Sequence, residues 1–205
     1  MIEPNQIDRF LTIVDQTPPV LTKAKGSKFY SQAIPFTTPA QLSEIIETTR
    51  SSYPKAGHHC YAYRTQSSYR VNDDGEPLHS AGDPILGQID SYQLVDVLVV
   101  VSRIFGGIKL GMSGLIKAYR EGAQTALQAA TIAEKHRTHI ITAICEYEHL
   151  NTLNQFIRSN QYDITARKML QNVELKIAIP LSHLGSIDER SKQLHHIHWN
   201  YDMAD

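Results

Sequence analysis

An apolar run in the middle of the chain predicts a buried strand, then a turn, then a long helix. Residues 94–102 are nearly all apolar and β-branched, which is typical of a strand covered on both faces. A basic, glycine-rich segment follows from Arg103 to Gly114, and we call it the glycine turn. The pattern is then helical from Ser113, the expected N-cap, to about Lys135, with small residues that let the helix lie close to a sheet.

The residues before this run predict a hairpin, two helices and a strand. Alternating apolar positions indicate strands, and spacing of three or four residues indicates helices. We expect Asp83 to be the N-cap of the second helix, with Pro84 at its first position. The predicted elements are strands 20–25 and 28–35, a helix entered at Thr38 and ending near Ser52, strand 59–65, a turn at 72–77 and helix 81–91.

A charged break at 134–137 separates this part from a new pattern. The elements that follow are, in order, strand 138–147, helix 149–159, strands 163–170 and 172–180, helix 181–194 and strand 196–201. A strand–helix–strand–strand–helix–strand order is the ferredoxin-like arrangement. The sequence therefore predicts two α+β domains, residues 1–136 and 137–205.

Composition limits the classes of partner. The chain has 205 residues, 41% of them hydrophobic and 20% charged, with a formal net charge of −1. Such a chain has no global attraction to nucleic acid or anionic lipid, so any such contact needs a local basic patch. Cys60 and Cys145 are too far apart for metal-ligand spacing, and no long apolar run or leader pattern is present. We expect a cytoplasmic protein with reduced thiols, no membrane contact, no cofactor and no metal.

The glycine turn has three interpretations. Its Gly106-x4-Gly111 spacing matches a nucleotide-binding P-loop, but Met112 stands where that loop needs lysine. A simpler anion or nucleic-acid site would use backbone N–H groups and nearby cations at a helix start. Its candidate residues are Arg103, Gly106, Gly107, Lys109, Gly111, Ser113, Lys117 and Arg120. In the third interpretation the glycines only permit a tight crossover, and Arg103 pairs with an acid.

Two further clusters carry titratable groups. The acidic turn, with Asp73, Asp74 and Glu76, is a solvated turn, a divalent-cation ligand set, or the source of an acid that pairs with Arg103. His58 and Cys60 share one face of their strand and could form a catalytic pair, whereas His59 faces the other way. His196 and His198 share a strand face that could chelate zinc, but no third ligand is evident, and exposed histidines explain them as well.

Several motifs occur together in one order, and with them the chain resembles the YigZ/IMPACT family. The matching segments are residues 25–29, 58–64, 73–77, 81–86 and 103–119. The similarity covers about residues 20–130, and the rest resembles the small second domain of bacterial members. Two positions depart from the family pattern: Ile104 replaces an aromatic residue, and Asp83 replaces a non-acidic one.

This resemblance implies folds that recur in the translation machinery. The first domain would be similar to the second domain of ribosomal protein five of the small subunit. The second would be ferredoxin-like, similar to a domain of elongation factor G. Eukaryotic relatives are linked to control of translation initiation, whereas function itself belongs to sites rather than to folds.

The residues and the resemblance together lead to one main hypothesis and one alternative. The main hypothesis is a non-enzymatic, translation-associated binding protein that contacts RNA, the ribosome or a translation-control protein through the glycine turn. The alternative is an enzyme that acts on a phosphorylated or anionic small molecule. In that enzyme Asp73, Asp74 and Glu76 would serve as a general base or hold magnesium beside the anion site.

Overall fold

A computed structural model describes residues 8–192 and 194–201 of the chain. The chain forms two compact units. The first contains Phe10–Lys135, and the second runs from His136 onward and includes Asp8 and Arg9. None of the described helices combines the length and the apolar character needed to cross a membrane.

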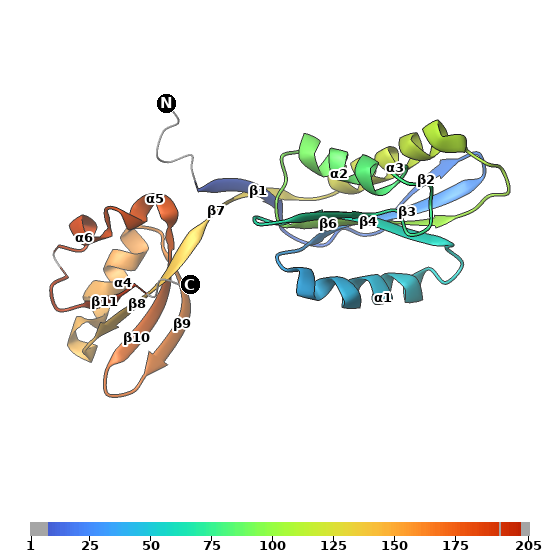
Figure 1. The fold of residues 1–205 in the computed structure, drawn as a ribbon. Coiled ribbons are helices and arrows are strands. Elements are labelled where there is room, and N and C mark those ends of the chain that lie inside the picture. The colour runs from blue at the N-terminus through green and yellow to red at the C-terminus, as the bar shows by residue number, and fades with distance from the viewer. Residues whose placement is uncertain (1–7, 193, 202–205) are drawn as a thin grey trace, which may run out of the picture. The chain divides into compact units, whose positions relative to one another are not determined.

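The first unit is built on a five-stranded sheet in the order β2-β3-β6-β4-β5, with antiparallel pairing throughout. Helices α2 and α3 lie on one face of this sheet and α1 on the other (Figure 1). The elements are α1 (Leu42–Ser52), α2 (Gly82–Ser91), α3 (Gly111–Gln128), β2 (Val20–Ala24), β3 (Ser27–Pro35), β4 (His58–Arg64), β5 (Tyr69–Asn72) and β6 (Val97–Ile104). The central place of β6 explains why its apolar residues continue without alternation.

Two apolar cores follow from this layering. Along β4, Cys60 and Ala62 belong to the core under α2 and α3, whereas Tyr61 and Tyr63 belong to the core under α1. The alternation expected for this strand is therefore confirmed. The hairpin of β2 and β3 is also confirmed, whereas β5 was not predicted.

Small residues bring α3 close to the sheet, as the sequence predicts. Ala118, Gly122, Ala123 and Ala126 are buried on its inner face. A Cβ atom added to Gly122 would lie 2.6 Å from Ser31 Oγ, which leaves no room for a larger residue without a shift.

The bounds of α3 differ from the prediction at both ends. The helix begins at Gly111 with Leu110 as its N-cap, so Ser113 lies inside the first turn and is not the cap. It ends at Gln128, and Lys135 belongs to β7 (Ile132–His136), which pairs with β1 (Arg9–Ile13). That pairing joins residues far apart in sequence, so a local helical pattern could not indicate it.

Helix α2 also begins differently from the prediction. Ala81 is its N-cap, and Asp83 and Pro84 both lie inside the helix, so the assignments of Asp83 as cap and of Pro84 as first residue were wrong. Asp73 takes over this role: its Oδ1 accepts hydrogen bonds from the backbone N–H groups of Ala81 and Gly82, both at 2.9 Å. The acidic turn therefore starts the helix that follows it.

The second unit follows the predicted strand–helix–strand–strand–helix–strand order. Its sheet has the order β11-β8-β10-β9, with antiparallel neighbours. The expected helix 181–194 was wrong, because two four-residue helices form instead, separated by Gly185 and Ser186. Glycine has a low helix propensity, which favours a break there. The elements are β8 (Thr138–Cys145), α4 (Leu150–Ser159), β9 (Asp163–Met169), β10 (Val173–Pro180), α5 (Leu181–Leu184), α6 (Ile187–Arg190) and β11 (His198–Asn200).

Gly106 carries the tightest backbone contact after β6, and we predict that Gly106→Ala destabilises the protein. An added Cβ atom would lie 1.9 Å from Gly26 C and 2.2 Å from Ser27 N, and both are backbone atoms. Overpacking of this kind costs about 1–3 kcal/mol or more of unfolding free energy. Urea denaturation measures that loss.

Gly87→Ala is the matched control for this substitution. Gly87 lies inside α2 with nothing within 4 Å of an added Cβ atom. Alanine there should raise the free energy of unfolding by about 0.5–1 kcal/mol, because glycine is unfavourable in a helix interior. A Gly106→Ala protein as stable as the unmodified chain would contradict the close approach.

Candidate functional site

The glycine turn meets the acidic turn, Asn72–Pro77, at one end of the sheet. Arg103 is the penultimate residue of β6, and its backbone pairs with Phe29 of β3 on one side and His58 of β4 on the other. The acidic turn leaves β5, the strand next to β4, and leads to α2. The sheet therefore brings the two turns together although 25 residues lie between Pro77 and Arg103 in the chain.

A buried ion pair joins these two turns. Arg103 Nη1 donates to Glu76 Oε1 at 2.6 Å, and Tyr119 Oη of α3 donates to the same oxygen at 2.7 Å. Arg103 is 6% exposed and Glu76 is 9% exposed. The guanidinium carbon also lies 5.6 Å from the ring centroids of both Phe29 and Phe105. The proposed pairing of Arg103 with an acid of this turn is confirmed.

The other two acids of the turn also have protein partners. Besides capping α2, Asp73 accepts a bond from the His79 N–H through Oδ2 at 3.0 Å. Asp74 binds Arg50 of α1 at 2.7 Å and accepts from the His59 N–H at 2.6 Å. No group of three or more His, Cys, Asp or Glu side chains within the described ranges could hold a metal ion. The bonds of the three carboxylates to protein groups therefore hold the acidic turn in its conformation.

His58 and Cys60 face the acidic turn rather than each other. His58 Nδ1 lies 2.8 Å from the carbonyl oxygen of Asp74. The Cys60 sulfur lies 3.0 Å from the carbonyl oxygen of Asp73 and 3.3 Å from Tyr119 Oη. Burial raises the pKa of the Cys60 thiol far above its ordinary value. Because the thiolate is the reactive form, this cysteine is not an activated nucleophile.

His59 is also buried. Its ring Nδ1 lies 2.9 Å from Ser102 Oγ. Burial lowers the pKa of His59, and the positive charge of Arg50 lowers it further. We assign His59 a place in the core packing rather than in chemistry.

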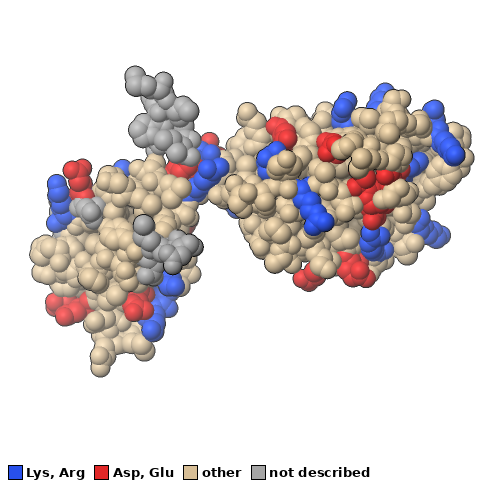
Figure 2. All heavy atoms as spheres, viewed as in Figure 1, with Lys and Arg blue, Asp and Glu red and all other residues tan. Residues whose placement is uncertain are grey.

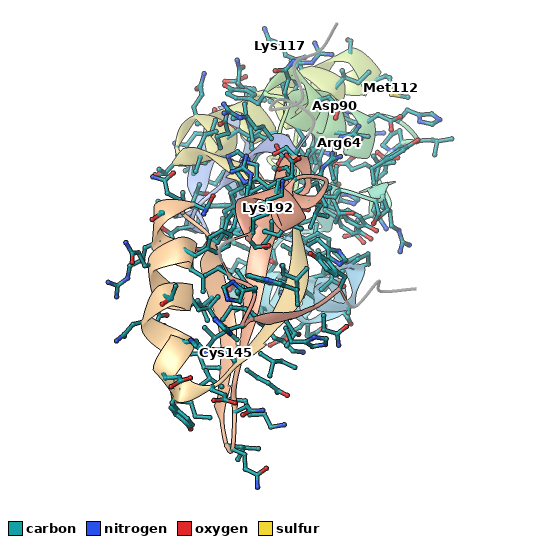
Figure 3. All side chains as sticks on the ribbon, turned by 90° about the vertical axis from the view of Figure 1, so that its left-hand side faces the viewer. Arg64, Asp90, Met112, Lys117, Cys145 and Lys192 are labelled. Carbon is teal, nitrogen blue, oxygen red and sulfur yellow. The ribbon has the colours of Figure 1, made fainter. Side chains whose placement is uncertain are left out.

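The remaining candidate cations are exposed. Lys109, Lys117 and Arg120 reach solvent, and Ser113, Lys117 and Arg120 share one surface hollow on α3 together with Glu121. Figure 3 shows Lys117 and Met112 projecting outward from α3. Of the four candidate cations, Arg103 is therefore buried, and the other three are exposed.

The start of α3 is open to an anion. Leu110 caps the helix without a side-chain hydrogen bond from any described residue, and its first turn contains no acid. Backbone N–H groups at such an end lack intrahelical partners and carry partial positive charge. Gly107 and Gly111 have φ values of +85° and +72°, a conformation that glycine adopts without strain.

Sequence reasoning missed the exposed apolar side chains of this region. Phe105, Ile108 and Met112 are 55%, 56% and 52% exposed, and Leu78 beside the acidic turn is 72% exposed. The sequence did contain a signal for them. Turns usually carry polar residues, so large apolar residues in the glycine turn indicate an exposed apolar surface.

His196 and His198 do not share a strand face, because β11 begins at His198 and His196 lies before it. The His196 ring stacks on that of His149, with centroids 4.4 Å apart and planes within 7°. His198 lies on β11 and is exposed. The zinc interpretation of His196 and His198 therefore gains no third ligand within the described residues.

Comparison with known proteins identifies the family. The family model described as the Impact N-terminal domain matches residues 25–127. The chain belongs to the IMPACT family. This family member is 32% identical over 156 residues to an IMPACT family member of Haemophilus influenzae, an alignment that covers 70% of this chain and 76% of that protein. The resemblance seen in the motifs is therefore confirmed.

Two further similarities extend beyond the matched domain. YvyE, an IMPACT family member of Bacillus subtilis, is 29% identical over 171 residues, which cover 82% of this chain and 79% of that protein. A crystal structure of a hypothetical protein aligns with a TM-score of 0.71 at 25% identity, over 97% of this chain and 100% of the other. The alignment with YvyE is longer than the first unit, so the similarity to IMPACT family members reaches into the second unit.

We predict that Arg103→Met lowers the free energy of unfolding by about 3–5 kcal/mol, because it leaves the Glu76 carboxylate buried without its cation. A second substitution, Glu76→Gln, should recover part of this loss. Urea denaturation of both single variants and the double variant measures the coupling.

The Arg64–Asp90 pair provides the control for this cycle. Its Nε–Oδ1 distance is also 2.6 Å, but the two side chains are 32% and 43% exposed, and they lie side by side in Figure 3. Arg64→Met should cost less than about 1 kcal/mol, because solvent screens surface pairs. Equal losses for Arg103→Met and Arg64→Met would contradict a structural role for the buried pair.

Proposed function

We propose that this IMPACT family member is a translation-regulatory binding protein that contacts ribosomal RNA through the start of α3. The observation that carries the proposal is a set of exposed cations: Lys109 lies just before the uncapped start of α3, and Lys117 and Arg120 lie farther along the helix. Helix N-termini and nearby cations are suited to phosphate groups. The family resemblance, which links eukaryotic relatives to translation control, supports the choice of partner.

Arg103 has a supporting role in this proposal. Because it is buried and paired with Glu76, it positions the glycine turn and leaves phosphate contacts to the exposed cations. On the face shown in Figure 2, Lys and Arg are interspersed with Asp and Glu among the described residues. Binding by so few cations should therefore be modest and should weaken with salt.

The folds of the two units are part of the proposal. We infer that the first unit has a fold like the second domain of ribosomal protein five of the small subunit, and that the second unit has a ferredoxin-like fold. The strand order β11-β8-β10-β9 supports the second assignment. A cytoplasmic location fits a ribosomal partner.

The bonding of the acidic turn opposes the alternative, an enzyme that acts on a phosphorylated or anionic small molecule. That alternative needs carboxylates free for base or magnesium chemistry. Asp73, Asp74 and Glu76 instead accept bonds from N–H and O–H groups of the protein. A protein partner in translation control is the other outcome that the following test can reveal.

We predict that the double variant Lys117→Ala/Arg120→Ala binds ribosomes more weakly than the unmodified protein. In co-sedimentation across a salt series, the slope of log K against log salt should fall by about 2, because two phosphate contacts are lost. The double variant should stay folded, because both side chains are exposed.

The matched control is Lys23→Ala/Lys55→Ala, which removes the same charge from exposed positions on β2 and after α1. It should leave both the affinity and the salt slope unchanged. Equal weakening by the two double variants would refute a specific contact at α3. If Lys117→Ala/Arg120→Ala weakens ribosome binding without changing the salt slope, the partner is a protein surface and not RNA.

A further inference from the structure

A cavity of about 400 Å³ opens beside the glycine turn, within the first unit. Its walls are mainly apolar, and its charged groups are Glu76, Arg103 and Lys109. The cavity is distinct from the hollow that Lys117 and Arg120 line farther along α3. Pockets of this size, with apolar walls and a few polar groups, are typical of small-ligand sites.

The Arg103 guanidinium at this cavity has unused hydrogen-bonding capacity. Its side chain is more than nine-tenths buried, yet Nε has no hydrogen-bond partner among the described residues. Nη2 makes only a long contact of 3.4 Å to Ser27 Oγ, so Nη1 alone is firmly held, by Glu76. Buried donors are normally paired, so an incompletely paired guanidinium in a cavity wall is suited to an acceptor supplied by a ligand.

The start of α3 contributes to the same cavity. Gly111 and Met112, the first two residues of the helix, line it. The helix has 18 residues and no side-chain cap from the described chain. An acidic group at this end would meet both the partial positive charge of the helix and the guanidinium.

The charge balance of the cavity favours one negative charge over two. Glu76 offsets one of the two cations, Arg103 and Lys109, and leaves a single positive charge. A carboxylate matches that charge, whereas a phosphate monoester carries close to two negative charges at neutral pH and would meet the Glu76 carboxylate.

The walls of the cavity favour an apolar body behind the acidic group. Phe105 and Met112 line it while more than half exposed, and Leu110 and Leu115 form its inner apolar surface. Exposed apolar side chains of this size around a cavity are typical of a binding site. Methionine is flexible and adapts to ligands of different shape.

We infer that this cavity binds a monocarboxylate with an apolar body. The carboxylate lies between the Arg103 guanidinium and the N-terminus of α3, and the apolar part lies against Phe105 and Met112. Such a group is supplied either by a free organic acid or by the carboxyl end of a partner's chain. The cavity shares Lys109 and the N-terminus of α3 with the ribosome contact proposed above, whereas Arg103, Phe105 and Met112 take no part in that contact.

The test is an amide NMR titration of the full chain with 4-methylpentanoate. Saturable shifts should appear at the backbone amides of Gly111, Met112 and Ser113. The uncharged analogue 4-methylpentanamide should bind at least tenfold more weakly, since it lacks the negative charge. Phe105→Ala and Met112→Ala should each weaken the binding of 4-methylpentanoate by about fivefold or more. Leu21 is an exposed apolar residue on β2, and Leu21→Ala should leave this affinity unchanged.

Two further arms identify the source of the carboxylate and the independence of the site. If acetyl-Ala-Ala-Leu with a free carboxyl end binds at least tenfold more tightly than 4-methylpentanoate, the ligand is a chain end. If the peptide and 4-methylpentanoate bind with equal affinity, the ligand is a free organic acid. The variant Lys117→Ala/Arg120→Ala should titrate like the unmodified protein even where it loses ribosome binding. Absence of saturable shifts at α3, or tighter binding of inorganic phosphate or uridine monophosphate, would overturn the inference.

Discussion

The buried ion pair between Arg103 and Glu76 is the interaction on which the first unit depends. Removing a guanidinium and a carboxylate from water costs several kcal/mol per ion, so each needs the other and further donors in the folded protein. Tyr119 supplies such a donor from α3. Because Glu76 belongs to the acidic turn, the pair also fixes Asp73, which caps α2, and Asp74, which holds Arg50 of α1. One network therefore connects the helices on both faces of the sheet.

This network positions the turn that carries the exposed cation Lys109, in a chain whose formal net charge is −1. The buried arginine fixes the path of the glycine turn, and Gly106 lets that turn pass against the backbone of Gly26. Lys117 then lies on α3, which packs against the sheet, and Lys109 lies in the turn just before that helix. Sites on rigid elements hold their geometry more closely, which offsets the small number of charges.

The sequence was sufficient where local pattern decides structure. The alternation in β4, the hairpin of β2 and β3 and the small inner face of α3 all follow from residue spacing. It was insufficient where partners are distant in the chain. The pairing of β7 with β1 replaced the end of a predicted helix, and Asp73 rather than Asp83 capped α2 because a preceding turn brought it there. For the site, the sequence named Arg103 and Glu76 but left open whether they pair or bind a ligand, since only the sheet register brings them together.

The central claim is that the glycine turn and the start of α3 form a contact surface held by this network. Amide hydrogen exchange of the full chain, with and without purified ribosomes, tests it most directly. We expect ribosome-dependent protection over residues 104–120, with α1 unchanged on the opposite face of the sheet. Protection confined to α1 or to the second unit, with residues 104–120 unchanged, would contradict the account.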